Sequence, residues 1–538
     1  MNDHDHDSPH AAMDQPTRGG APGPWSPSDG TGEAAIDQTT QSTADLASHS
    51  VPPIPPQGSS NSTLLKVTVG MTAAFLLVAV AILGVVLLGG DDEPQFRSAK
   101  TANDEPAERS ADEEDAAGTT ATPDDAPSTN SLVGMLGSTP LVDLDDEFKD
   151  RLRQVDPALV DYNYAAESYD AAIVIGLAAE AAGTDGSALA QRINDITRDG
   201  EKCTDFASCQ AILDVGGDPD YDGQSGPLEF SGNGEPTRAS YGILQFGTVG
   251  CVETVGCVET VECIDDANTE FVMAEAPAKA DVPQVPVTVD RGGDGTLKLG
   301  SLLPKTGSLA FLGPPEFAGI DLAVREMNAA GGVLGSEVSH IEGDSGDTEN
   351  AVAPKTVSTL LAQDVDAIIG APSTSVTLSV IDTVTNAGVV MFSPAATSKT
   401  LSDYDDQGLL FRAAPSDILQ GAVLAETVAG DGHRDVYILA LNDDYGTELA
   451  DDFTTSFEAN GGSVAGTEIY DPKATTFADV VGSAKQAEPD AVLLLGFDET
   501  SKILAEMIDQ DIGPSSLPVY GVDGNMGNAL VENFEAGR

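Results

Sequence analysis

From Leu297 onward, short apolar runs alternate with segments in which apolar residues recur at helical spacing. The apolar runs predict strands at "LKLGSLL", "VSHIEG", "VDAIIGA", "VVMFSP", "DVYILALN", "DAVLLLGF" and "LPVYGVDG". The segments between them predict helices near residues 315–330, 349–363, 376–387, 416–429, 447–459, 474–487 and 499–510. Strands that alternate with helices in this way are typical of a parallel sheet with helices on both faces. We therefore expect an α/β fold with two such sheets in sequence.

The N-terminal part of the chain lacks this pattern. Residues 1–62 are rich in Ser, Pro, Gly, Asp and Thr and poor in large apolar side chains, so we expect a disordered tail. Residues 63–90 contain the uncharged run "VTVGMTAAFLLVAVAILGVVLLGG". As a helix this run is about 36 Å long, enough to cross a hydrocarbon core of about 30 Å. It is too long and too deep in the chain for a signal peptide, so we expect one transmembrane helix.

The flanks of this helix favour one orientation. Lys66 precedes it, and under the positive-inside rule it favours a cytoplasmic N-terminus, although Arg97 and Lys100 oppose this. Residues 91–130 are acidic and rich in Ala, Thr and Pro, as expected of a flexible linker. We therefore expect a single-pass protein of the cell membrane with its globular part on the extracytoplasmic side.

The charge of the chain excludes one class of partner. The 88 acidic residues outnumber the 25 basic ones and give a net charge of -63. Such a surface repels polyanions, so we expect no nucleic-acid partner.

Three stretches of the globular part resemble a known family: "GSLLPKTGSLAFLGPPEFAGIDLAVREMNAAGGVLG", "IIGAPSTSVTLSVIDTVTNAGVVMFSPAATS" and "LALNDDYGTELADDF". They are similar to the type I periplasmic binding proteins, and most similar to the branched-chain amino acid binding proteins of ABC importers. The resemblance covers residues 297–538. It implies a two-lobed periplasmic-binding-protein type I fold, with two doubly wound parallel sheets joined by a hinge.

Residues 131–247 resemble the C-terminal third of the same family, which is absent after residue 538. The similar features are "YNYAAESYDA", a second helix and a hairpin at "GQSGPLEF", in that order. We interpret this order as a circular permutation in which residues 248–296 bridge the displaced part and the start of the domain at residue 297. Surface termini that lie close together tolerate such a change. A tandem array truncated at both ends, or a mis-assembled gene, are the alternatives.

The resemblance also implies which residues hold the ligand. In the family, backbone groups, hydroxyls and one acidic side chain hold the α-carboxylate and α-ammonium in a cleft between the lobes. The matching positions in the first lobe are Thr374, Ser375, Ala395 and Thr397. Those in the second lobe are Tyr445 and Asp523, and those along the side-chain pocket are Leu312 and Tyr164. Asp523 stands where the family commonly has Glu, one methylene longer, which affects the specificity for amino acids. A lone Ser or Thr at a strand end is as typical of a helix cap as of a ligand contact.

Two further motifs have simpler interpretations. "GDSG" around Ser345 occurs near some protease nucleophiles, but outside the expected tail at residues 1–62 only His340 and His433 are available as a base, so we expect a turn. Residues 218–229, "DPDYDGQSGPLE", match the spacing of a calcium loop. Because "PLEFSG" predicts a strand where an EF-hand needs a helix, we favour an acidic turn without metal.

The cysteines fall into two groups. Cys203 and Cys209 are expected to form a disulfide in an extracytoplasmic protein. Cys251, Cys257 and Cys263 lie in the repeat "VGCVETVGCVETVEC", which has no CxxC spacing and no nearby histidine, so we expect no zinc site.

These features favour a binding protein. We expect an extracytoplasmic solute-binding protein of an ABC importer whose lobes close over a branched-chain type amino acid or a related small polar ligand. Its partners would be this small molecule and an ABC permease in the membrane. A ligand-sensing receptor domain that acts through a partner signalling protein is the alternative. No catalytic constellation supports an enzyme, and we expect no cofactor.

Overall fold

The computed structural model describes residues 132–250, 260–264, 269–276, 283–348 and 350–536. All of them lie in one compact unit, Gly118–Arg538. The expected tail, transmembrane helix and linker at residues 1–62, 63–90 and 91–130 lie outside the described residues. Within the described ranges no single helix is long and apolar enough to span a bilayer, although the bent pair Ala165–Ala182 and Ser187–Ile196 passes that test jointly.

The first lobe is built on a five-stranded sheet in which all neighbouring strands are parallel. Its spatial order is β8 (Ser339–Asp344), β7 (Lys298–Leu303), β9 (Ala367–Gly370), β10 (Val390–Ser393) and β11 (Leu410–Arg412). In chain order these are strands 2-1-3-4-5, a doubly wound arrangement that leaves a crevice at the carboxyl ends of the strands.

Helices cover both faces of this sheet, as its alternating side chains require. On one face Leu299, Ile369 and Phe392 join a core with the helices α3 (Ala165–Ala182) and α6 (Gly313–Ala330). On the other face Ile368 and Met391 pack against α7 (Val352–Ala362) and α8 (Thr374–Asn386). The short strands are buried on both sides, which explains their continuous apolar runs.

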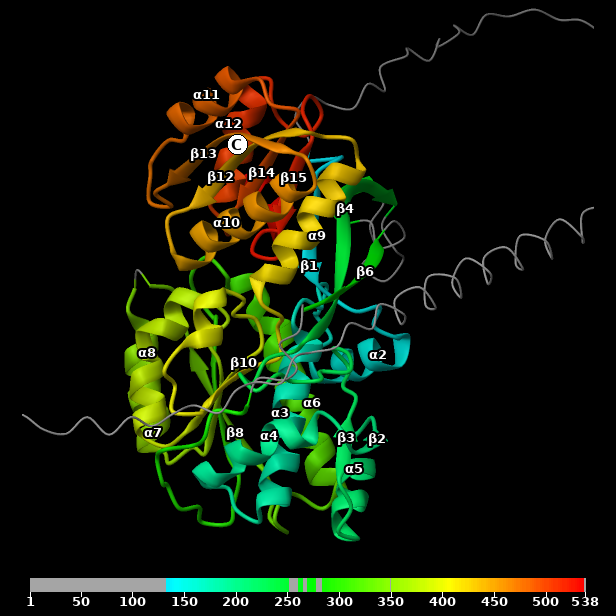
Figure 1. The fold of residues 1–538 in the computed structure, drawn as a ribbon, viewed down its shortest axis with the longest axis vertical. Helices are drawn as coiled ribbons and strands as arrows, with labels where there is room; N and C mark the ends of the chain where they lie inside the picture. Colours follow the sequence, from blue (N-terminus) through cyan, green and yellow to red (C-terminus); the bar gives the residue numbers. More distant parts are fainter. Residues whose placement is uncertain (1–131, 251–259, 265–268, 277–282, 349, 537–538) are drawn as a thin grey trace, which may run out of the picture. The chain divides into compact units, whose positions relative to one another are not determined.

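The second lobe repeats this topology with a strand from elsewhere in the chain. Its parallel strands are ordered β13 (Ser463–Tyr470), β12 (Asp435–Leu441), β14 (Ala491–Leu495), β15 (Val519–Val522) and β1 (Leu136–Pro140). β1 takes the fifth place, parallel to β15, with Gly137 opposite Gly521. In Figure 1 the red β15 and the cyan β1 lie in one sheet.

The second sheet is mixed, which corrects the expectation of two purely parallel sheets. β4 (Arg238–Gly250) is antiparallel to β1, and the antiparallel β5 (Thr260–Ile264) and β6 (Glu270–Glu275) pair with β4. Antiparallel neighbours need no crossover helix between them, so the alternation of strands and helices does not extend to β4, β5 and β6.

Helices cover both faces of the second sheet as well. Leu439, Val492 and neighbours face the helices α11 (Ala478–Ala487), α12 (Thr500–Asp509) and α13 (Ala529–Ala536). Ile438, Leu493 and neighbours face α9 (Asp417–Gly430) and α10 (Asp444–Ala459). All the predicted helices and strands after Leu297 are therefore confirmed, while β11, β13 and α13 had not been predicted.

Residues between β1 and β4 return to the first lobe. They form α2 (Asp146–Val155), α3, η1 (Ser187–Leu189), α4 (Ala190–Ile196), β2 (Glu201–Cys203), α5 (Phe206–Asp214) and β3 (Pro219–Tyr221). Much of this segment shares one core with the first sheet. The chain therefore passes between the lobes several times, and the passages after β1, before β4 and after β11 meet at a small cavity lined by Pro140, Pro236 and Pro415.

Two local predictions have clear outcomes. Cys203 and Cys209 are joined by a disulfide with a Cα–Cα distance of 5.3 Å. The strand predicted at "PLEFSG" is wrong: Leu228 and Glu229 have left-handed φ values of 54° and 48°, and only Phe230 makes an isolated bridge, to Pro236. Left-handed residues break an extended run, so the hydrophobic pattern here reflects burial and not pairing.

Candidate functional site

A small pocket lies where the carboxyl ends of strands from both lobes meet. It is lined by Tyr164, Leu309, Leu312, Pro372, Ser373, Thr374, Ala395, Thr397, Tyr445, Phe497, Asp523 and Gly524. Most of these residues directly follow a strand: β7, β9 and β10 in the first lobe, and β12, β14 and β15 in the second. This is the crevice in which open α/β sheets bind ligands.

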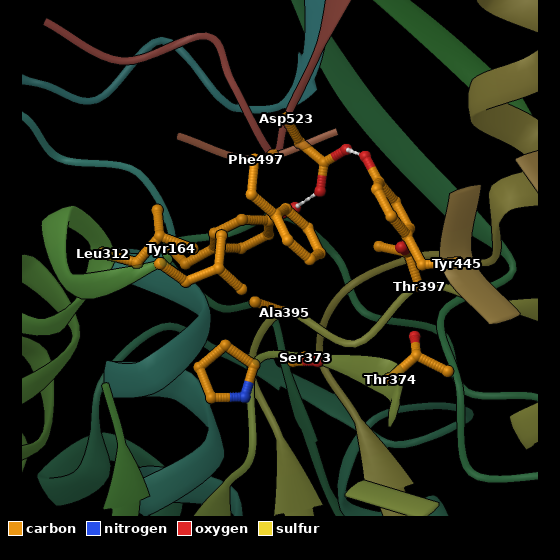
Figure 2. A pocket seen from close by; sticks show the side chains of 12 residues that line it. Tyr164, Leu312, Ser373, Thr374, Ala395, Thr397, Tyr445, Phe497 and Asp523 are labelled. Atoms are coloured by element: carbon orange, nitrogen blue, oxygen red, sulfur yellow. Dashed lines mark hydrogen bonds between the residues drawn. The ribbon is translucent and has the colours of Figure 1, made fainter. Parts of the chain in front are cut away.

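Asp523 is the acidic group of the pocket. Its Oδ2 accepts a hydrogen bond from the Tyr164 hydroxyl (2.7 Å), and its Oδ1 accepts bonds from the Tyr445 hydroxyl (2.7 Å) and the Gln420 amide (3.0 Å). Figure 2 shows the carboxylate between the two tyrosines. Burial raises the pKa of Asp523, while these hydrogen bonds lower it and only partly offset the burial. A cation placed here would favour the charged carboxylate.

The first lobe brings hydroxyl and backbone groups to the other side of the pocket. Ser373 caps α8 by accepting a hydrogen bond from the N–H of Val376 (3.3 Å), so Thr374 stands in the first turn of the helix. A helix N-terminus has free N–H groups and a positive dipole end, and both favour a carboxylate. Thr397 contributes a second hydroxyl from the loop after β10.

Apolar side chains form the remaining wall. Tyr164, Leu309, Leu312 and Ala395 belong to one small buried cluster. Phe497 packs against it and stacks on Tyr445, with ring centroids 5.4 Å apart and an interplanar angle of 13°. The pocket therefore joins one acidic group, a set of hydroxyls at a helix terminus and an apolar surface.

The structure brings together most of the residues predicted from the sequence. Tyr164, Leu312, Thr374, Ala395, Thr397, Tyr445 and Asp523 line the pocket. Ser375 does not line it: its hydroxyl donates to Asp443 Oδ2 (3.2 Å) in a neighbouring, larger cleft. Phe497, Ser373, Leu309, Pro372 and Gly524 were missed. Each follows a strand, but an aromatic or a proline at that place is more often core or turn.

The larger cleft separates the lobes next to the pocket and has a volume of about 600 Å³. Beside it, one face of α10 is bound to the first lobe. Glu448 accepts hydrogen bonds from Ser398 and Thr400, and Asp452 forms an ion pair with Lys399 (2.7 Å). Each of these contacts joins the two lobes beside the cleft.

A Ser–His–Asp chain exists elsewhere in the first lobe. His340 Nε2 lies 2.8 Å from the Ser301 hydroxyl, and its Nδ1 lies 2.8 Å from Asp321 Oδ1. Ser301 is 0% exposed, so its hydroxyl is not accessible to a substrate. Ser345 of the "GDSG" motif is also buried and donates to the Gly346 carbonyl (3.3 Å). The contact between His340 and Ser301 joins β8 to β7.

The loop with calcium-like spacing contains a lysine ammonium among its acids. Lys202 Nζ lies 3.0 Å from Asp220, 2.9 Å from Asp222 and 3.6 Å from Glu229. In the described part of the chain no group of three or more metal-binding side chains is found. Of the remaining cysteines, Cys263 lies in β5, whereas Cys251 and Cys257 fall outside the described residues.

Comparison with known proteins gives consistent results. Residues 296–533 match the family model described as periplasmic binding protein. The chain is 28% identical over 227 residues to Leu/Ile/Val-binding protein homolog 7 of Brucella abortus, covering 40% of this chain and 55% of that protein. It is 28% identical over 225 residues to BasB of Halobacterium salinarum, a substrate-binding protein of a chemotactic signal transduction system, covering 40% and 54%.

One solved structure to which the chain is similar is the branched-chain amino acid transporter substrate-binding protein LivJ of Streptococcus pneumoniae in complex with isoleucine. It is 29% identical, covers 45% of this chain and 68% of its own, and has a TM-score of 0.40. The chain spans about half the length of the curated relatives it matches.

Proposed function

We propose that the chain is an extracytoplasmic solute-binding protein of an ABC importer of the type I periplasmic binding protein family, a proposal supported by the match of residues 296–533 to the family model and by the Leu/Ile/Val-binding relatives. Its lobes close over a branched-chain amino acid or a related small polar ligand, which it delivers to a permease in the membrane. It acts by binding and not by catalysis.

The observation that carries this proposal is the polarity of the pocket. Asp523 lies on the second-lobe side, the Thr374 and Thr397 hydroxyls and the α8 N-terminus lie on the first-lobe side, and Leu312 lies on the apolar wall. A zwitterion with an apolar side chain matches all three, because its ammonium faces the acid and its carboxylate faces the hydroxyls and amides.

Thermal unfolding of residues 118–538 in the presence of L-leucine, L-valine, L-alanine and L-glutamate tests this function. A ligand at one hundred times its Kd stabilises the folded state by about 2.7 kcal/mol. We expect leucine or valine to raise the Tm and glutamate to leave it unchanged. A cooperative transition that no amino acid shifts would contradict the proposed ligand class.

We also propose that the domain is circularly permuted, with residues 131–247 as its displaced end. Two observations support this: β1 occupies in the second sheet the fifth position that β11 occupies in the first, and α3 packs against α6 from beyond the bridge. Residues 283–538 alone should then lack a cooperative transition, while residues 118–538 should have one. Cooperative unfolding of residues 283–538 alone would favour a truncated tandem array.

Membrane attachment through residues 63–90 remains part of the proposal. The full chain should fractionate with membranes after a carbonate wash, and its globular part should be cleaved by protease added to the outside of intact cells. Release into the soluble fraction would contradict this attachment.

A receptor role is the second candidate, favoured by the similarity to BasB, which is named as part of a chemotactic system. In that case the ligand-bound chain would bind a membrane signalling protein. Co-purification of the full chain from membranes with and without leucine distinguishes the two, since an importer partner carries an ATP-hydrolysing subunit and a chemotaxis partner does not.

A further inference from the structure

Asp417 is a second buried acid behind the pocket. It is the first residue of α9 and is 0% exposed. Its N–H donates to the carbonyl of Thr397 (2.8 Å), a residue that lines the pocket. Neither of its carboxylate oxygens has a hydrogen-bond partner of normal geometry among the described residues. The Thr397 hydroxyl, although outside normal hydrogen-bond geometry, lowers the pKa of this carboxyl, but a fully buried carboxylate with so little compensation is costly when charged.

The first turn of α9 connects this acid to Asp523. Gln420, one turn after Asp417, donates to Asp523 Oδ1 and to the Ser138 carbonyl, both at 3.0 Å. The pKa of Asp417 is raised well above its ordinary value, by burial first and then by the nearby Asp523 carboxylate, which together outweigh the opposing effects of Thr397 and Arg412. The two acids therefore interact within one buried polar cluster behind the pocket, formed by Asp417, Gln420 and Asp523.

Among the residues that the structure describes, Arg412 is the cation that acts on Asp417, and it does not neutralise both acids. Arg412 is engaged elsewhere: its guanidinium binds Glu235 through Nε (2.9 Å) and Nη2, and donates to Ser402 (2.7 Å) and to backbone carbonyls. The other groups that affect Asp417 are Asp452 on α10, itself acidic, and Tyr241 on β4, whose hydroxyl has no partner among the described residues. Two neighbouring buried carboxylates without a cation do not both ionise.

We propose that Asp417 and Asp523 share one proton while the pocket is empty, and that the ammonium of an amino acid ligand displaces it. One cation enters and one proton leaves to the solvent, so the total charge of this buried polar cluster is unchanged. Asp417 is then a positioning residue that restricts the pocket to ligands with an ammonium group. Purely anionic acids such as benzoate bring no charge that replaces the proton. This inference rests on the proposed function.

The linkage has a defined sign. The bound ammonium favours the ionised form of the pair, so the liganded protein holds fewer protons than the empty one. Affinity for leucine therefore rises as the pH rises toward the pKa of the empty pair, by up to about tenfold per pH unit, and then levels off.

Titration calorimetry with L-leucine in buffers of different ionisation enthalpy measures the released protons directly. We expect the full chain to release about one proton per leucine at pH values below the pKa of the empty pair, which a series of measurements at several pH values locates. Asp417→Asn should release close to none and lose most of the pH dependence, because Asp523 then ionises without a neighbouring acid. Glu426→Gln, at an exposed position of the same helix, should behave like the unaltered protein.

The outcomes separate the two levels of the proposal. Leucine binding with a heat that is independent of the buffer would overturn proton sharing and leave the proposed function intact. Binding of benzoate in place of leucine would overturn the ammonium requirement. No heat with any amino acid would overturn the proposed function and this inference with it. If Asp417→Asn does not fold, the buffer series on the unaltered protein decides alone.

Discussion

The hydroxyl of Tyr164 donates a 2.7 Å hydrogen bond to Asp523, 359 positions away in the sequence. Tyr164 precedes α3 in the first lobe with a left-handed backbone (φ 59°), and Asp523 follows β15 in the second. The bond therefore joins the two lobes at the acidic end of the pocket. A left-handed tyrosine costs about 1–2 kcal/mol, a strain of the kind that persists at binding sites.

Replacement of Asp523 tests the ammonium contact. Asp523→Asn keeps the shape of the side chain but removes its charge, so leucine binding should weaken by about 2–5 kcal/mol, roughly 30-fold to 5,000-fold. Calorimetry measures the change in Kd. Asp509→Asn, at an exposed position of α12, is the matched control and should bind normally. Unchanged affinity in Asp523→Asn would place the ammonium elsewhere.

Glu448 should control the closed state. Its carboxylate accepts hydrogen bonds from Ser398 and Thr400 across the lobes. Glu448→Gln weakens these charge-assisted bonds, so closure should become less favourable by about 1–3 kcal/mol. Small-angle scattering of the ligand-free protein should show a larger radius of gyration, and leucine should dissociate faster. Glu458→Gln, exposed on the same helix, should change neither value.

Asp443 should make stability depend on pH. Burial raises its pKa from 3.8 to about 6, an effect only partly offset by its hydrogen bonds from Gly446 and Ser375. An acid with a higher pKa in the folded state stabilises the fold while protonated, and this contribution is lost as the pH rises through about 4 to 6.

Asp443→Asn keeps the cap of α10 but has no charge to bury. It should therefore increase the free energy of unfolding by about 1–3 kcal/mol at pH 7.5 and by less at pH 4.5. Urea unfolding at both pH values measures this, with the exposed neighbour Asp444→Asn as control. An equal effect at both pH values would contradict the burial of a charged Asp443.

The disulfide should stabilise the fold without affecting the pocket. Cys203 and Cys209 are 6 positions apart, and closing such a loop in the unfolded chain contributes about 2 kcal/mol. The double variant Cys203→Ser, Cys209→Ser should lose this amount in urea unfolding. Its leucine Kd should not change, because neither residue lines the pocket. A weakened Kd would mean that α5 and the pocket are coupled.

The central strands were predictable from the sequence because they are buried on both faces and therefore read as continuous apolar runs, as in "DVYILALN". β13, at the sheet edge, alternates exposed and half-buried residues and was missed. "PLEFSG" has the apolar character of a strand, but the left-handed Leu228 and Glu229 prevent pairing.

The site was predictable where a family motif fixes a strand end, as at Asp523 and Thr397. It was not predictable where a common structural role explains the residue equally well. Ser375 has the hydroxyl that the motif requires, yet its helix position turns it to Asp443. Asp417 has the position of an ordinary acid in the first turn of a helix. Only the fold shows that no solvent reaches it.

The pairing of β1 with β15 has a consequence for folding during synthesis on the ribosome. About 380 residues separate the end of β1 from the start of β15, and ribosomes need roughly 20 to 80 s to add them. Throughout this time the edge of β1 that will face β15 has no partner, and such an edge can pair with other chains. The second lobe therefore completes its sheet only near the end of translation, and we expect its nascent form to depend on chaperones more than the first lobe does.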